Sequence, residues 1–241
     1  MTALIVGATG ATGRLLVETL LNQGIKVRII IRSPAQFPDS LITNSQLSIT
    51  IANLLDMTDE ELQCQVQGCE AVISCLGHNL TIKGLFGHPR RLVSIATNRL
   101  CEAIKKTDPE RCVKYILMNT TGNQNKQAGE TISISQAIVV GLLRHLLPPH
   151  ADNEEAAAYL QSHFGKNQNV IEWTAVRPDT LTNEVSVTEY DVYSSPTRSA
   201  IFDAGKSSRI NVANFMSRLV TNDDIWQKWK RHMPVIYNAE K

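Results

Sequence analysis

The residues best suited to chemistry are the glycines of GATGATG, residues 7–13. This segment follows a short aliphatic run and precedes a helical pattern, which is the context in which a glycine-rich turn can bind a pyrophosphate. Gly7 permits the tight turn, Gly10 lets the backbone approach the phosphates, and Gly13 lets helix and strand pack closely. The free N–H groups at the start of the helix favour negative charge. The segment therefore predicts a dinucleotide site.

A second chemical signal is Arg32, which with Ser33 follows the next aliphatic run. An NAD-selective site usually has an acidic residue at this place, where it binds a ribose hydroxyl. A guanidinium suits a 2′-phosphate instead, because it can donate paired, charge-assisted hydrogen bonds. The sequence predicts NADP(H) as the cofactor, and a solvated arginine at a strand end is the alternative interpretation.

Two later segments are expected at the same crevice, because ligands of open α/β sheets bind outside the carboxyl ends of the strands. Asn53 and Leu54 follow the third aliphatic run and are predicted to flank the adenine. Cys75, Leu76 and Gly77 follow the fourth run and are predicted to pass beneath the adenosine ribose and the phosphates.

The elements that must position these residues alternate between aliphatic runs and helical patterns. Such alternation indicates a parallel sheet covered on both faces. We therefore expect a doubly wound α/β fold with a mostly parallel sheet, as a single domain over residues 1–241. Strands are predicted at 2–6, 26–31, 47–51, 71–75, 113–118 and 170–176, and helices at 13–23, 58–66, 90–106, 136–147, 151–163 and 212–220, with Pro148 and Pro149 separating two of the helices.

The overall charge provides little attraction for polyanions. Lysine and arginine (24) nearly balance aspartate and glutamate (23), which gives a formal net charge of +1 and no field that would draw in nucleic acid or an anionic membrane. The first apolar run is too short for a signal sequence, and no stretch reaches the roughly 20 apolar residues that span a bilayer. We expect a cytoplasmic protein with no nucleic acid or membrane partner.

The cysteines and histidines give no sign of a disulfide framework or a metal site. The five cysteines are odd in number and contain no C-x-x-C pair, which favours reduced thiols. The six histidines lack metal-ligand spacing, so no metal is predicted. His78 follows Gly77 and could reach a substrate, although a histidine in a surface loop is the more common case.

Several segments over most of the chain resemble one known family. They are GATGATG at 7–13, Arg32, VISCLG at 72–77, LMNTTG at 117–122 and WTAVRPDTLTN at 173–183, while SSRINVANFMSRLV at 207–220 looks like the late segment that closes the fold. Together they resemble the atypical short-chain dehydrogenase/reductases, in particular the NmrA-like and flavin reductase/biliverdin reductase B-like branch. This resemblance implies a Rossmann fold that binds NAD(P).

The resemblance also implies site residues. Thr120 or Thr121 would lie on the nicotinamide side, and Arg177 and Pro178 would line the pocket near it. The part of the chain from about 178 to 210 would contribute to the substrate pocket. Residues Thr9, Gly10, Ala11, Thr12 and Gly13 would hold the pyrophosphate, Arg32 the 2′-phosphate, and Asn53 and Leu54 the adenine region.

The chain departs from the wider superfamily at the catalytic Tyr-x-x-x-Lys pair. Pro149 falls at the tyrosine position and Asn153 at the lysine position. Tyr159 is followed four residues later by His163, so packing is the expected role of this tyrosine. Thr121 is then the proton-relay candidate at a family-matched place, and an isolated hydroxyl is a poor general acid near neutral pH.

These features favour an NADPH-dependent oxidoreductase that acts on a small conjugated acceptor such as a flavin or a quinone, which can take its proton from water. The alternative is a non-catalytic, NmrA-like module that binds NADP(H) and reports redox state to a protein partner. A nucleotide-sugar epimerase is less favoured, because that chemistry normally uses the missing tyrosine. The protein would be a monomer or a homodimer.

Overall fold

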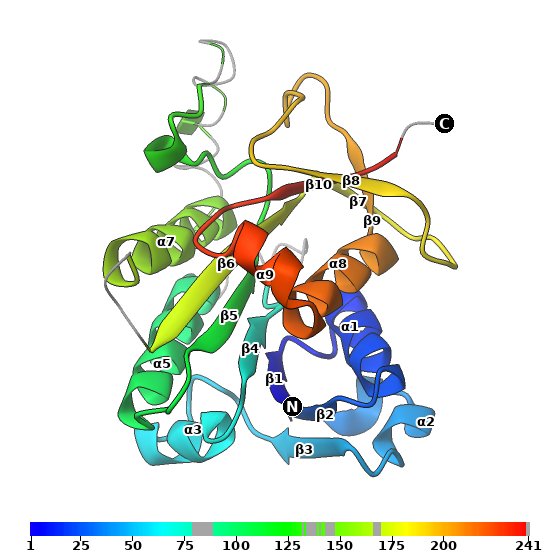
Figure 1. Ribbon diagram of the computed structural model, residues 1–241, viewed down its shortest axis with the longest axis vertical. Coiled ribbons are helices and arrows are strands. Elements are labelled where there is room, and N and C mark those ends of the chain that lie inside the picture. The colour runs from blue at the N-terminus through cyan, green and yellow to red at the C-terminus, as the bar shows by residue number, and fades with distance from the viewer. Residues whose placement is uncertain are drawn as a thin grey trace.

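The centre of the computed structural model is a sheet whose strand order matches a doubly wound fold (Figure 1). Residues 1–78, 89–131, 133, 139, 141–142, 148–165 and 170–239 are described. The strands of the central sheet are β1 (Thr2–Val6), β2 (Lys26–Ile31), β3 (Leu47–Ile51), β4 (Ala71–Ser74), β5 (Val113–Met118), β6 (Ile171–Pro178), β8 (Tyr190–Tyr193) and β10 (Val235–Asn238). The order across the 8-stranded sheet is β3-β2-β1-β4-β5-β6-β10-β8. All neighbours run parallel except β8, which pairs antiparallel with β10.

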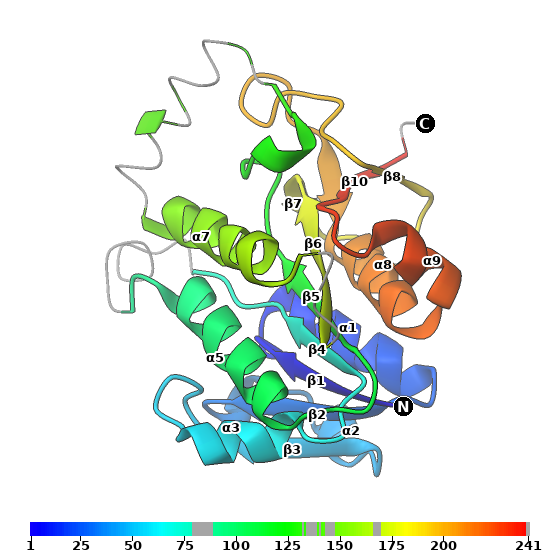
Figure 2. The same cartoon turned by 60° about the vertical axis from the view of Figure 1, so that its left-hand side comes forward.

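Helices cover both faces of this sheet (Figures 1 and 2). One face carries α3 (Asp59–Val66), α5 (Leu92–Lys106) and α7 (Pro148–His163), and the other carries α1 (Ala11–Asn22), α8 (Arg209–Thr221) and α9 (Asp223–Trp229). The short α2 (Asp39–Ile42) lies beside β3, and β7 (Thr180–Thr182) pairs with β9 (Lys206–Ser208). Among the described helices, none is both long enough and apolar enough to cross a membrane.

Each central strand contributes side chains to two separate cores, because successive residues of a strand point to opposite faces. Along β1, Leu4 and Val6 join the core beneath α3, α5 and α7. Ala3 and Ile5 join the core beneath α1, α8 and α9. The near-continuous apolar character of these strands follows from this double burial.

The structure confirms the doubly wound, mostly parallel α/β fold and four of the predicted strands, 2–6, 26–31, 47–51 and 113–118, to the residue. The placement of Pro148 and Pro149 between two helices was wrong, because both belong to the first turn of α7. Proline fits there because the first turn needs no donor from its backbone nitrogen. The predicted helix at 136–147 lies mostly outside the described residues.

The end of the chain also differs from the prediction. The sequence predicts the last helix at 212–220, but a further helix, α9, and the strand β10 follow it. β10 is a short strand between β6 and β8. Its four residues give too weak a periodic signal on their own, and pairing on both sides stabilises them as a strand.

Candidate functional site

The glycine segment forms a turn that side chains would obstruct. Gly7 has a φ of +76°, and a Cβ at this position would lie 2.5 Å from the backbone C and O of Cys75. A Cβ on Gly13 would lie 2.2 Å from the carbonyl oxygen of Gly7. The glycines therefore allow β1, α1 and the end of β4 to approach closely, as the sequence predicts.

The start of α1 leaves backbone donors available for an anion. Its N-cap is Gly10, which provides no side-chain hydrogen bond, and its first turn contains no acidic residue. The first bond of the helix is donated by Arg14 to the Gly10 carbonyl, so the N–H groups of the intervening residues lack helical partners. Within this segment Thr9 is partly exposed, Gly10 and Ala11 are exposed, and Thr12 and Gly13 are buried. An uncapped, uncharged helix start fits the pyrophosphate of a dinucleotide.

Arg32 lies directly after β2, at the same edge of the sheet as the glycine turn. It is exposed, and no carboxylate of the described residues forms an ion pair with it. The next residue, Ser33, accepts a hydrogen bond from the N–H of Ala35 at 3.3 Å and caps the short turn that follows. The guanidinium of Arg32 is thus available for a phosphate.

The segment after β3 brings a polar side chain and a stretch of backbone to this edge. Asn53 is exposed and donates to Asp56 at 2.8 Å. The Leu54 side chain is 7% exposed and packs in the core, and its carbonyl accepts a hydrogen bond from Arg99 at 3.0 Å. If Leu54 contacts the adenine region, it does so mainly through its backbone.

The segment after β4 passes directly beside the glycine turn, as the close approach of Gly7 to Cys75 shows. Burial raises the pKa of the Cys75 thiol to about 12, so this cysteine remains protonated and unreactive near neutral pH. Leu76 packs against the core, and Gly77 is exposed. All five cysteines are free thiols.

The segment after β5 places both candidate threonines at the carboxyl edge. The hydroxyl of Thr120 accepts a hydrogen bond from the N–H of Gly122 at 3.3 Å. Thr121 is buried, donates its N–H to the Pro178 carbonyl at 3.1 Å, and has its hydroxyl within hydrogen-bonding reach of Asp179. Burial raises the pKa of the Asp179 carboxyl. The role of Thr121 in proton transfer stays a prediction.

Arg177 lies near the end of β6, and its guanidinium forms hydrogen bonds with buried groups of the protein. Its guanidinium is 0% exposed and donates to both carboxylate oxygens of Glu130, at 2.6 and 2.9 Å. It also donates to the carbonyls of Asn123 and Met233, at 2.9 and 2.7 Å. Arg177 therefore holds three chain segments together behind the pocket, and direct contact of Arg177 and the buried Pro178 with the cofactor stays a prediction.

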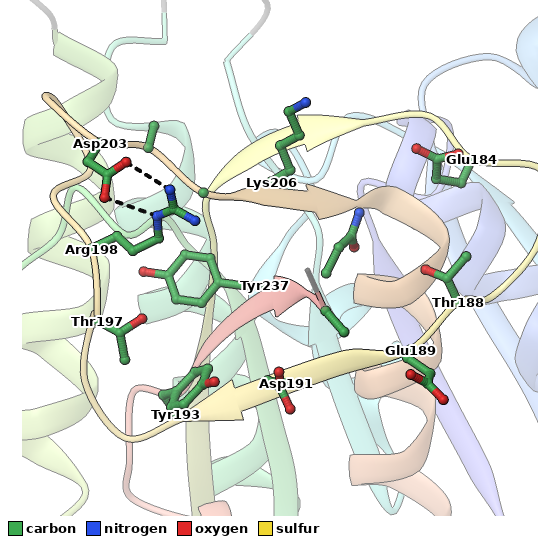
Figure 3. A pocket seen from close by; sticks show the side chains of 14 residues that line it. Glu184, Thr188, Glu189, Asp191, Tyr193, Thr197, Arg198, Asp203, Lys206 and Tyr237 are labelled. Atoms are coloured by element: carbon green, nitrogen blue, oxygen red, sulfur yellow. Dashed lines mark hydrogen bonds and ion pairs between the residues drawn. The ribbon is translucent and has the colours of Figure 1, made fainter. Parts of the chain in front are cut away.

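Two cavities flank the segment 194–199 at the carboxyl edge. A cavity of about 520 Å³ lies between the residues after β5, including Thr121 and Glu130, and residues 195–199. A larger one of about 1220 Å³ lies farther along the sheet, around Tyr193 and Tyr237, where Arg198 pairs with Asp203 (Figure 3). The smaller cavity adjoins Thr121, so it is the better candidate for the acceptor.

Helix α7 carries Asn153, which the resemblance sets at the lysine position, and Tyr159, and the contacts of both side chains are structural. Asn153, at the lysine position, donates to the Pro149 carbonyl at 3.0 Å, and its own carbonyl accepts from Asn119. Tyr159 donates its hydroxyl to Glu102 on α5 at 3.0 Å, away from the carboxyl edge. Burial raises the pKa of the Tyr159 phenol, which is the opposite of what a catalytic tyrosine needs.

Sequence reasoning missed one pair of residues at this edge. Asp152 on α7 accepts a hydrogen bond from Nε2 of His78, at 2.8 Å, and both side chains are almost completely buried. A signal for Asp152 existed, since it shares one helical face with Ala156 and Leu160, which are core residues. An aspartate on a buried face must find donors. Within the described residues, no group of three His, Cys, Asp or Glu side chains is arranged to hold a metal ion.

The sequence matches a family described as NAD(P)H-binding over residues 7–223. This match covers most of the chain and includes the glycine turn, Arg32 and the strand-end segments described above. The chain therefore belongs to this NAD(P)H-binding family, and its fold is a Rossmann fold. Comparison with curated proteins finds no match.

Solved structures share this fold at low sequence identity. A proposed NAD-dependent epimerase/dehydratase from Bacillus halodurans has a TM-score of 0.72 and 20% identity, with coverage of 100% of this chain and 95% of the other. A wide-type short-chain dehydrogenase/reductase from Veillonella parvula, in complex with NADP, has a TM-score of 0.67 and 15% identity, with coverage of 98% of this chain and 94% of the other. A proposed NADH-flavin reductase from Streptococcus pneumoniae has a TM-score of 0.67 and 15% identity, with coverage of 99% of this chain and 100% of the other. At these identities the likeness establishes the fold alone.

Proposed function

We propose that the protein is an NADPH-dependent reductase that transfers reducing equivalents to a small conjugated acceptor such as a flavin or a quinone. The observation that carries this proposal is the combination of the uncapped α1 start with the exposed Arg32 directly after β2, which pairs with no carboxylate of the described residues. The first suits a pyrophosphate and the second a 2′-phosphate. The neighbours from Veillonella parvula and Streptococcus pneumoniae, which are named for NADP and for flavin reduction, support it by analogy.

The residues of the chain have distinct roles in this proposal. The backbone from Thr9 to Gly13 binds the pyrophosphate, Arg32 binds the 2′-phosphate, and Asn53 and Leu54 border the adenine. The residues after β4 and β5 support the ribose and nicotinamide side, and residues of the 178–210 part close the acceptor cavity. A cytoplasmic location, a single domain and a monomeric or homodimeric state belong to the same proposal.

The test is NADPH consumption by the purified protein, followed by near-ultraviolet absorbance with FMN, FAD, riboflavin and simple quinones. Saturable turnover with at least one acceptor supports the reductase. Tight NADPH binding without turnover of any acceptor would favour the redox-sensing module, which the structural use of Asn153 in place of a catalytic lysine would then explain.

The preference for NADPH over NADH can be tested with Arg32→Ala. We expect this change to weaken NADPH binding by about 10- to 100-fold, because a charge-assisted contact to phosphate contributes roughly 1.5–3 kcal/mol. NADH binding should change less than about twofold. Titration of tryptophan fluorescence with each nucleotide gives both dissociation constants.

The matched control is Arg111→Ala, because Arg111 is an exposed arginine that precedes β5 and so lies at the opposite, amino edge of the sheet. It should leave both affinities unchanged. Equal losses of NADPH and NADH affinity in Arg32→Ala would rule out the 2′-phosphate assignment.

A further inference from the structure

His78 lies at the carboxyl edge of the sheet beside the proposed cofactor site. It comes three residues after Cys75, whose backbone faces Gly7 across the glycine turn. The His78 side chain is 5% exposed, so it is buried at this edge of the sheet and does not lie on the outer surface. This position contrasts with the surface-loop location that the sequence favours.

Asp152 fixes the orientation of the His78 ring. Its carboxylate is 0% exposed and accepts hydrogen bonds from the backbone N–H groups of Val93 and Ser94, at 2.7 and 2.9 Å, and from the Ser94 hydroxyl at 2.6 Å. The fourth hydrogen bond comes from Nε2 of His78 at 2.8 Å. Three of these four donor groups, the two N–H groups and the Ser94 hydroxyl, belong to the first turn of α5, whose positive end also favours the carboxylate.

This network determines which ring nitrogen can exchange a proton. Both oxygens of Asp152 face donors, so Nε2 of His78 is the nitrogen that carries a proton toward the carboxylate. Nδ1, on the other side of the ring, has no hydrogen-bond partner among the described residues, so it is the ring nitrogen that can bind and release a proton. A histidine held by a buried carboxylate in this way has a fixed orientation and tautomer, as a general acid requires.

Other groups at the edge are less suited to this role. The oxygens of Asp179 accept hydrogen bonds from the N–H groups of Thr180 and Gly205, at 2.9 and 3.0 Å, and so act as acceptors. The side chain of Asn153 does not titrate. Of these three side chains, the imidazole of His78 is the one suited to donate a proton.

The charged groups around the pair come from α7 and the segment before α5. Asp152 contacts His78 directly. Arg91, just before α5, forms an ion pair with Glu155, three residues after Asp152 on α7. His150 Nε2 and a carboxylate oxygen of Glu154 are 3.5 Å apart on α7, and the His150 ring lies beside Gly122 in the segment after β5. Among the described residues, Asp152 is the charged group that contacts the His78 ring.

We propose that His78, oriented by the positioning residue Asp152, donates the proton for reduction of a conjugated carbonyl acceptor such as a quinone. This inference rests on the proposed function and narrows its acceptor class. When bound, the reduced nicotinamide supplies a hydride, and with it both electrons, to the acceptor. As negative charge collects on the acceptor oxygen, the Nδ1–H bond of the His78 imidazolium breaks and an O–H bond forms. The neutral ring then takes a proton from water.

The experiment compares wild type with His78→Gln, whose amide can still donate a hydrogen bond to Asp152 but cannot titrate. We expect kcat with 1,4-naphthoquinone to fall by at least about 100-fold, while the NADPH dissociation constant stays within about twofold. With FMN, where the charge collects on a ring nitrogen and water supplies the proton, kcat should fall less than about threefold.

A readout without turnover is ¹⁵N NMR of the histidine rings in the nucleotide-free protein. It should show His78 with its proton on Nε2, and this resonance should shift in Asp152→Asn. The matched control, His232→Gln, replaces an exposed histidine outside the site and should change none of these quantities.

The outcomes separate this inference from the proposed function. If wild type reduces 1,4-naphthoquinone and His78→Gln does so at the wild-type rate, or loses the quinone and FMN activities equally, His78 is not the proton donor. A wild-type protein that reduces FMN but no quinone would also overturn the inference. A neutral His78 ring that carries its proton on Nδ1 instead of Nε2 would also overturn the inference. If wild type binds NADPH but reduces no acceptor, the proposed function fails, and the proton-donor role fails with it.

Discussion

Replacing Gly7 with alanine is expected to weaken NADPH binding by at least about 100-fold, which corresponds to roughly 3 kcal/mol. The added Cβ would lie 2.5 Å from the backbone of Cys75, so the glycine turn and the end of β4 must move apart. Backbone atoms cannot rotate away as a flexible side chain can. The turn would then no longer direct its N–H groups toward the pyrophosphate.

The control for this substitution is Gly24→Ala. Gly24 has nearly the same backbone conformation, with a φ of +75°, but a Cβ there would meet nothing within 4 Å. This variant should lose roughly 1–2 kcal/mol of stability from the left-handed conformation alone and keep full NADPH affinity. Fluorescence titration and thermal unfolding of both variants separate the two effects. If Gly7→Ala binds NADPH as tightly as Gly24→Ala, the phosphate-binding role of the turn is wrong.

The second large effect is expected for Glu130→Ala. This change leaves the guanidinium of Arg177, which is 0% exposed, without its carboxylate partner. Removing one partner of a buried ion pair typically lowers the free energy of unfolding by about 3–5 kcal/mol, because the remaining charge stays buried and uncompensated. Urea denaturation followed by circular dichroism measures this loss.

Glu155→Ala is the matched control for the buried pair. Glu155 also forms an ion pair with an arginine, Arg91, but both side chains are largely exposed, at 43% and 64%. Exposed pairs contribute less than about 1 kcal/mol, so this variant should unfold close to wild type. Equal destabilisation of the two variants would show that burial does not determine the strength of the Arg177–Glu130 pair.

Helix α7 shows where prediction from sequence reached its limit. The helical pattern at 151–163 was visible in the sequence, and the structure confirms it as part of α7. The hydrogen bond between Asp152 and His78 joins residues separated by 74 positions, and no local pattern connects them. The packing of α7 on α5 and against the carboxyl edge is what brings this carboxylate to the histidine.

Arg177 shows a similar limit for a residue whose importance the sequence did indicate. The family resemblance implied a pocket residue, and the structure places Arg177 near the end of β6. Its partner Glu130 lies 47 positions earlier, in a segment without a strong periodic pattern. The structure therefore shows how the charge is used, which the sequence did not.

The sequence by itself determined the strand-turn-helix with its glycine turn, the alternation of strands and helices, and through them the doubly wound fold. These features are local: glycine at a tight turn, a period of 3.6 in helices and nearly continuous apolar strands, each readable within about a dozen residues. Only the tertiary structure decided the pairing of His78 with Asp152, the burial of Arg177 against Glu130, and the insertion of β10 between β6 and β8. Those outcomes depend on contacts between distant segments, whose energies arise only when the sheet and its helices pack together.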